Sequence, residues 1–183
     1  MRNIWRSVAA TVLCLAFATQ VQATSVTRKL ADLTKDMPIS VPELAGMDAV
    51  QRKQVACLAY NIYFEARGST MADQIGVAYV VLNRIGHPEF RTNACEVVFQ
   101  LTSHAGRTFP QFSWTTYRHR LRKVEWDCWE LSQQLALLVW QGHLADPTDG
   151  ATYFRDSHGA APRVTPRFSV IGGHVFIREM ASR

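Results

Sequence analysis

Glu65 is the residue best suited to acid chemistry, and it lies in the segment Tyr63-Phe64-Glu65-Ala66-Arg67-Gly68. Apolar residues recur at helical spacing before it, so a helix is expected to carry it. At 100° per residue Glu65 falls about 20° from Leu58, which places it at the edge of the apolar stripe. Partial desolvation there disfavours the charged carboxylate and raises the pKa. Such a group can hold a proton near neutral pH and deliver it to a leaving-group oxygen as a general acid.

The alternative is a structural role, in which Glu65 pairs with Arg67 or with another base at the end of the helix. The residue pattern alone does not separate these two readings. Several further short motifs lie on both sides of Glu65. Leu58-Ala59 precedes it. The others follow in this order: Gly76-Val77-Ala78, Val80-Val81-Leu82-Asn83-Arg84, Cys95-Glu96-Val97-Val98-Phe99-Gln100, Gln111-Phe112-Ser113-Trp114, Asp146-Pro147-Thr148, Gly150-Ala151-Thr152-Tyr153, and Ile171-Gly172-Gly173-His174-Val175-Phe176 with Arg178.

In this order the motifs resemble the spore cortex-lytic enzyme family, the SleB/CwlJ-type cell wall hydrolases, from about Val55 to Arg178. The resemblance implies a lysozyme-like catalytic domain whose motif glutamate, here Glu65, cleaves between N-acetylmuramic acid and N-acetylglucosamine. Such enzymes often act as lytic transglycosylases. That route needs one carboxylate, because the sugar's own 6-hydroxyl attacks the anomeric carbon. The nearest other acids in sequence are Asp73, Glu89 and Glu96, and none stands in a motif that singles it out.

Amide and aromatic side chains near these motifs are candidates for binding sugar rings. We expect substrate binding by Gln111, Trp114, Tyr153, Tyr63 and Gln74. The alternative for the Gln-Phe-Ser-Trp motif is that Phe112 and Trp114 belong to the core and Gln111 to a turn. Arg67 and His174 are expected to be structural.

Two positions depart from the family pattern: Ser69 stands where a second glutamate commonly follows, and Pro110 where a cysteine often precedes Gln-Phe-Ser. The first removes a supporting carboxylate, and the second removes the usual partner of Cys95. We therefore expect a disulfide between Cys57 and Cys95, with Cys128 buried between Trp126 and Trp129. Three cysteines in the mature chain cannot all pair internally.

Metal and cofactor signatures are missing from the sequence, which has no CxxC, HExxH or paired Cys/His spacing. We expect no metal and no cofactor. An N-acetylmuramoyl-L-alanine amidase is the first alternative function, although it would normally need zinc. A non-catalytic peptidoglycan-binding protein is the second.

Helices must position Glu65, and the strands come after them. The patterns predict helices over 48–66, 75–82, 94–101 and 126–143, joined by a Ser/Gly/Pro-rich loop before residue 111. Strands are predicted at 151–155, 168–171 and 174–178, with a hairpin at Gly172-Gly173. Helices first and a small sheet last indicate an α+β fold.

Residues 1–23 are typical of a signal peptide, since Arg2 and Arg6 precede a short apolar run that ends at Val21-Gln22-Ala23. Residues 24–47 are predicted to be a flexible lead-in, and 48–183 the catalytic domain. We expect a periplasmic or secreted protein, without stable membrane insertion after cleavage. The net charge of +5, without a Lys/Arg block, suits peptidoglycan strands as partner and does not indicate nucleic acid.

Overall fold

The computed structural model describes residues 25–116, 123–158 and 167–178. The expected signal peptide, 1–23, lies outside these residues. The chain divides into two units, Met1–Pro38 and Ile39–Arg183, and the candidate site belongs entirely to the second. None of the helices in the described ranges has the length and apolar character needed to cross a membrane.

Helices predominate in the second unit and a three-stranded sheet comes last, as predicted for an α+β fold, but a short hairpin precedes the last helix. The elements are η1 (Pro42–Gly46), α2 (Ala49–Ala66), α3 (Met71–Arg84), α4 (Ala94–Val98), β1 (Leu101–His104), β2 (Arg107–Pro110), η2 (Ser113–Thr115), α5 (Trp126–Trp140), β3 (Tyr153–Asp156), β4 (Arg167–Ile171) and β5 (His174–Arg178).

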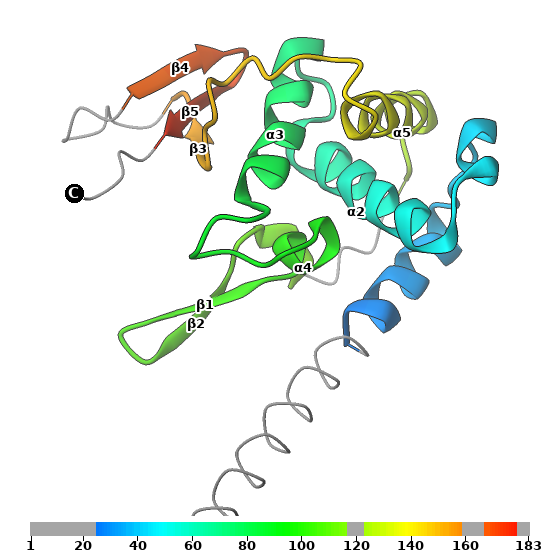
Figure 1. Cartoon of the computed structure of the whole chain (residues 1–183), viewed down its shortest axis with the longest axis horizontal. Helices are drawn as coiled ribbons and strands as arrows, with labels where there is room; N and C mark the ends of the chain where they lie inside the picture. Colours follow the sequence, from blue (N-terminus) through cyan, green and yellow to red (C-terminus); the bar gives the residue numbers. More distant parts are fainter. Residues whose placement is uncertain (1–24, 117–122, 159–166, 179–183) are drawn as a thin grey trace, which may run out of the picture. The chain divides into compact units, whose positions relative to one another are not determined.

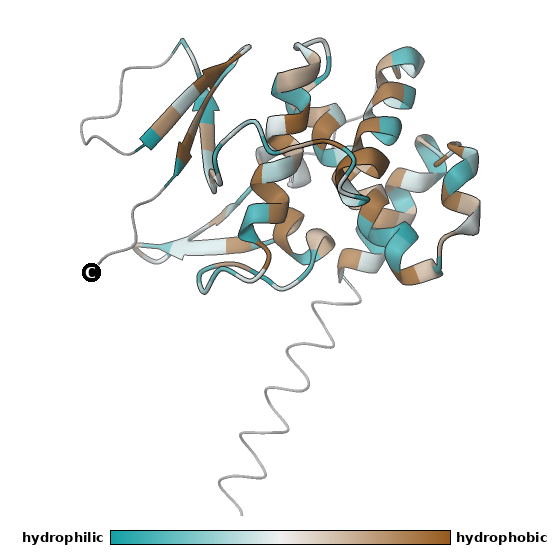
Figure 2. Cartoon of the chain, turned by 45° about the horizontal axis from the view of Figure 1, so that its top comes forward, coloured by the Kyte–Doolittle hydropathy of each residue, from teal (hydrophilic) through white to brown (hydrophobic). Residues whose placement is uncertain are grey.

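Helix α2 is the central element of the unit and contacts α3, α4 and α5 (Figure 1). It begins at its predicted cap, Asp48, whose carboxylate accepts from the backbone N–H groups of Val50 and Gln51. The predicted apolar stripe is buried, and so are most other residues from Val55 onward. Figure 2 shows brown, apolar segments on the helices that pack around α2. Burial on nearly all sides makes α2 a rigid support for what lies at its end.

Helix α3 covers the predicted 75–82 segment and begins earlier, because Thr70 caps it by accepting from the N–H of Asp73. Gly76 lets the last strand approach closely. A Cβ at Gly76 would lie 2.6 Å from a ring carbon of Phe176 on β5. The absence of a side chain at this position therefore permits the contact between α3 and the sheet.

Helix α4 is shorter than predicted and is joined to α2 by a disulfide between Cys57 and Cys95. This is the expected pair. Cys128, in contrast, is a free thiol that is partly exposed, with its Sγ 3.8 Å from a carboxylate oxygen of Glu125. The expectation that Cys128 is buried between two tryptophans is wrong, because Trp126 is exposed at the first turn of α5.

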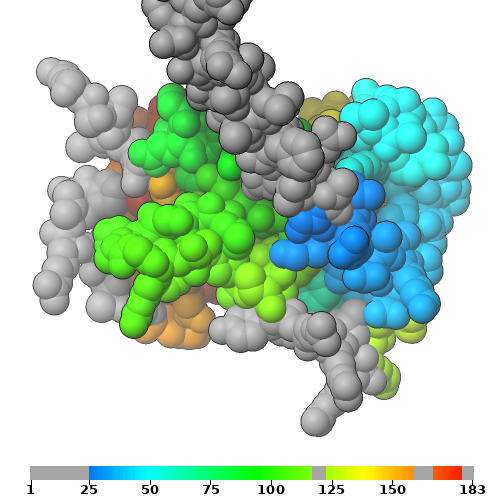
Figure 3. Space-filling model, turned by 90° about the horizontal axis from the view of Figure 1, so that it is seen from below, coloured from blue at the N-terminus to red at the C-terminus, as the bar shows by residue number. Residues whose placement is uncertain are grey.

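A two-stranded antiparallel hairpin, β1 and β2, occupies part of the stretch that was expected to be a loop. Its turn is made by Ala105 and Gly106, both with positive φ. The hairpin runs away from α4 in Figure 1, and Figure 3 shows their green surface gathered on one face. Most hairpin residues are exposed.

The C-terminal strands form an antiparallel sheet of order β3-β5-β4, at the predicted positions. Strand β5 pairs with both neighbours, and Gly172-Gly173 form the predicted turn into it. The sheet contacts α3 through β3 and β4. The sheet and α2 therefore both pack on α3 (Figure 1).

Residues 24–47, predicted to be a flexible lead-in, contain regular structure. Residues 25–36 are helical in the first unit, and η1 forms at Pro42–Gly46 in the second. Proline at the first position of η1 suits a helical start, since its fixed φ is already helical.

Candidate functional site

Glu65 occupies the last turn of α2 and is half-buried. The helix ends immediately after it, because Arg67 leaves helical geometry and Gly68 follows with φ 81°. The carboxyl group thus lies where the helix stops and two other elements approach. Arg67 does not pair with it, since the Arg67 Nε is 3.1 Å from Oε1 of Glu125.

Burial raises the pKa of Glu65, and the positive charges of His174 and Arg84 act in the opposite direction. The burial effect is the larger one, so the protonated acid is favoured relative to an exposed glutamate. A carboxyl group that keeps its proton towards neutral pH is suited to general acid catalysis.

His174 begins β5 and is fixed by Asp73 of α3. The imidazole Nδ1 lies 2.7 Å from Oδ1 of Asp73 and donates to it. The other carboxylate oxygen, Oδ2, accepts from the backbone N–H of Gly173 at 2.9 Å. Asp73 is fully buried and His174 largely so. Both oxygens of this carboxylate are therefore used inside the protein.

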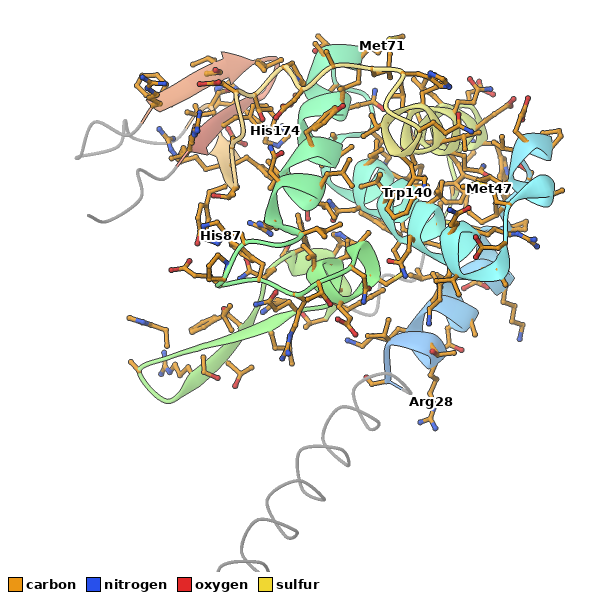
Figure 4. All side chains as sticks on the ribbon, viewed as in Figure 1. Arg28, Met47, Met71, His87, Trp140 and His174 are labelled. Carbon is orange, nitrogen blue, oxygen red and sulfur yellow. A yellow bond between two sulfur atoms is a disulfide. The ribbon has the colours of Figure 1, made fainter. Side chains whose placement is uncertain are left out.

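The turn before His174 is shaped to reach Asp73. Gly172 has φ 56°, and a Cβ at that position would lie 2.6 Å from Oδ2 of Asp73. The imidazole also packs edge-on against Phe154 of β3, with ring centroids 4.9 Å apart. Figure 4 shows His174 between the sheet and α3. These contacts leave the imidazole little freedom to turn.

An apolar cluster holds the end of α2 beside the start of β5. Its buried members come from α2, α3, the segment before β3, and β5, and they are Ala66, Val77, Val80, Ala151 and Phe176. Ala66 follows Glu65 directly. Phe176 and His174 lie two residues apart on one strand and so share a face of the sheet. The cluster thereby joins the neighbours of Glu65 to the neighbours of His174.

Arg84 supplies a second cation from the last residue of α3. Its Nε donates to the carbonyl oxygen of Thr152 at 2.7 Å. Its guanidinium lies over three aromatic rings, at 4.7, 5.0 and 5.4 Å from the centroids of Phe90, Phe112 and Tyr153. Burial lowers its pKa to about 10, against the opposing influence of Tyr153 and Glu65. The Nη1 atom has no hydrogen-bond partner among the described residues.

Three of the predicted substrate-binding residues lie in the core. Trp114 is buried, stacks on Phe64 and donates its indole N–H to Asn61. For Trp114 this favours the alternative, in which Phe112 and Trp114 belong to the core. Tyr63 is buried against Trp129, and its hydroxyl accepts from the N–H of Glu125.

Gln74 is likewise buried, and its amide donates to the carbonyl oxygen of Ser69. The Gln74 amide nitrogen, the Tyr63 hydroxyl and the Trp114 indole nitrogen all bond within the protein, so we do not assign these three residues to sugar contact. Gln111 and Tyr153 remain partly exposed. The Tyr153 hydroxyl lies 3.2 Å from Oε2 of Glu89, and its ring adjoins Arg84.

Within residues 25–116, 123–158 and 167–178, no group of three His, Cys, Asp or Glu side chains is placed so that it could hold a metal ion. A groove elsewhere in the unit is lined by residues of η1, of α5 and of the segment after α5, which include Pro42, Glu43, Glu130, Leu137, Leu138 and His143. None of these lining residues belongs to the surroundings of Glu65. The groove is therefore separate from the candidate site.

Comparison with known proteins gives the family. The family model for cell wall hydrolases matches residues 68–177, which is more than half of the chain. The chain belongs to the cell wall hydrolase family. Glu65 stands three residues before the matched range, so its role rests on the site geometry and on the motif that contains it.

A curated relative of this cell wall hydrolase is the spore cortex-lytic enzyme of Halalkalibacterium halodurans. It is 28% identical over 125 residues, which cover 67% of this chain and 34% of the relative. The chain thus spans about a third of the length of that relative.

Two solved structures share the fold. One is the catalytic domain of the Bacillus cereus SleB protein, with TM-score 0.51, 21% identity, and coverage of 76% of this chain and 98% of that one. The other is the catalytic domain of the germination-specific lytic transglycosylase SleB from Bacillus anthracis, with TM-score 0.51, 25% identity, and coverage of 75% and 100%. The predicted SleB/CwlJ-type family and lysozyme-like α+β fold are confirmed.

Proposed function

We propose that this cell wall hydrolase cleaves the glycan strand of peptidoglycan between N-acetylmuramic acid and N-acetylglucosamine, as a lytic transglycosylase with Glu65 as general acid. The observation that carries the proposal is the half-buried Glu65 carboxyl, whose pKa is raised by burial. Support also comes from the family and from the relative named as a lytic transglycosylase.

The chemistry has two proton transfers through one carboxyl group. Glu65 delivers its proton to the glycosidic oxygen as the bond to the anomeric carbon breaks. The 6-hydroxyl of the muramic acid then attacks that carbon, and the Glu65 carboxylate takes the hydroxyl proton. The acid form is restored, and the product carries a 1,6-anhydro ring.

A single carboxylate is the simplest arrangement for this site. The Asp73 carboxylate bonds to His174 and to Gly173 within the protein, and Glu89 lies beside the Tyr153 hydroxyl. Neither contact points to a second acid poised with Glu65 on the two sides of a sugar, as a two-carboxylate glycosidase needs. This supports internal attack by the 6-hydroxyl.

Tyr153 and Gln111 are the residues we assign to glycan contact. Both are partly exposed, and Tyr153 lies next to Arg84, a cation under the influence of Glu65. An aromatic ring and an amide supply the stacking and hydrogen-bonding groups that sugar rings need. We also propose export by the segment 1–23, since peptidoglycan lies outside the cytoplasmic membrane.

Mass spectrometry of muropeptides after digestion tests the reaction. We expect 1,6-anhydro ends from wild-type protein, without added metal and undiminished by EDTA. Reducing ends would replace the transglycosylase with a hydrolytic muramidase. Free stem peptides, lost in EDTA and restored by zinc, would transfer the assignment to the amidase. Binding to peptidoglycan without any product would make the protein a non-catalytic binder.

A further inference from the structure

The end of α2 lies next to the turn into β5, because Ala66 shares a buried apolar cluster with Phe176, and a Cβ at Gly173 would lie 3.8 Å from the Ser69 hydroxyl oxygen. Two basic groups act on the Glu65 carboxyl there: His174 from β5 and Arg84 from the end of α3. The other ionisable groups around these two are Asp73 behind His174, and Tyr153 with Glu89 beside Arg84. Arg67, on the helix that carries Glu65, is turned to Glu125. Both basic groups therefore favour the ionised form of Glu65, and a buried carboxylate, Asp73, lies behind one of them.

We propose that Asp73 and His174 form a positioning pair for Glu65, in which Asp73 fixes the imidazole and the imidazole supports the carboxylate left after proton delivery. This inference rests on the proposed function of Glu65 as general acid. It gives His174 a role in catalysis beyond the structural role that its sequence position predicts.

The geometry favours a fixed imidazole over a mobile one. Nδ1 is held by Asp73, the ring edge packs on Phe154, and the turn before it is anchored through Gly173. With Nδ1 committed to the carboxylate, only Nε2 is available for a further interaction. A buried carboxylate behind an imidazole sets the tautomer and orientation and stabilises the protonated ring, which is the role of the aspartate in Ser-His-Asp triads.

The simplest alternative is a purely structural contact that ties the β4–β5 turn to the start of α3. A structural contact needs only Nδ1, whereas a positioning pair also needs the rest of the imidazole ring for its effect on Glu65. Asparagine separates them, because its side-chain amide can occupy the place of Nδ1 and donate to Asp73. His174→Asn keeps the hydrogen bond to Asp73 and removes the rest of the imidazole ring, including Nε2 and its charge.

The test is the pH profile of kcat/KM for wild type, His174→Asn and Asp73→Asn, with Arg167→Gln as control. Arg167 is an exposed β4 residue whose guanidinium lies 4.0 Å from a carboxylate oxygen of Asp149, so its variant removes a positive charge from the same sheet at a residue with no assigned role. We expect kcat to fall roughly 10- to 100-fold in His174→Asn, the range expected when a reacting group loses its geometry. In His174→Asn the basic limb of the kcat/KM profile should also move to higher pH. The variant lacks a cation that favours ionised Glu65, so the pKa of Glu65 should rise.

Asp73→Asn should move the limb in the same direction, and Arg167→Gln should follow wild type. A His174→Asn protein with wild-type kcat and an unmoved basic limb would overturn the positioning pair. If Asp73→Asn does not fold, His174→Asn alone decides the matter. Activity retained by Glu65→Gln would instead overturn the proposed function, so the two failures are distinguishable.

Discussion

The Nε of Arg84 donates to the carbonyl oxygen of Thr152 at 2.7 Å and joins the last residue of α3 to the residue before β3. This bond brings the aromatic ring of Tyr153 under the guanidinium, next to the region of Glu65. Only the planar guanidinium of arginine can donate a hydrogen bond through Nε and also present its faces to aromatic rings, so another residue cannot make both contacts at this position.

Replacement of Arg84 by lysine should therefore destabilise the protein. A lysine has no Nε–H fork and no planar face, so the Thr152 bond and the ring contacts are lost together. We expect the free energy of unfolding to fall by about 1–3 kcal/mol, measured by chemical denaturation. Arg107→Lys, on the exposed hairpin, is the matched control. Equal stability of the two variants would contradict the role of Arg84.

Replacement of Glu65 by glutamine should abolish cleavage and leave the fold intact. Glutamine keeps the shape of the side chain but has no acidic proton to donate. The loss should be at least about 10²- to 10⁴-fold in muropeptide release, with an unchanged circular dichroism spectrum. Clearing of peptidoglycan within a few-fold of wild type would remove Glu65 from the mechanism.

The same variant should be more stable than wild type as the pH rises. Because burial raises the pKa of Glu65, its stabilising contribution is present below the unfolded pKa and is lost as the pH rises through the folded pKa. Glutamine resembles the protonated acid at every pH. The unfolding free energies of wild type and Glu65→Gln should therefore be similar in acid, and the variant should become the more stable of the two towards neutral pH. Parallel curves from acid to neutral pH would show that Glu65 is not desolvated.

The disulfide should be detectable by non-reducing peptide mapping as a Cys57–Cys95 linkage, with Cys128 alone alkylated. It closes a loop of 38 residues. A Cys57→Ser/Cys95→Ser variant should lose about 2–4 kcal/mol of stability, whereas Cys128→Ser should lose little. A Cys95–Cys128 linkage, or three alkylated thiols, would rule the pairing out.

Local signals in the sequence were sufficient for most elements. The cap at Asp48, the stop at Gly68 and the Gly172-Gly173 turn each act on neighbouring backbone, so each could be recognised from adjacent residues. The β1–β2 hairpin was missed, because its strands are short, mostly exposed and without apolar alternation. Its turn at Ala105-Gly106 was the one available sign.

The site was less predictable than the fold, because its parts are distant in the chain. Asp73 and His174 are 101 residues apart, and nothing at either position indicates the other. Arg84 stood in a family motif, yet its burial among three rings depends on loops from elsewhere. Trp114 and Tyr63 were predicted to belong to the site, but they lie in the core. Both have the side chains that bind sugars, but packing against α2 and α5 uses them internally.

The strand order β3-β5-β4 places the last strand of the sheet between the two that precede it. Within the residues that the structure describes, β4 pairs with β5 and not with β3, so these two strands join one sheet only when β5 lies between them. His174 arrives with that same strand. A folding chain that already carries Glu65 on a complete α2 therefore still lacks the imidazole until the central strand of this sheet is in place.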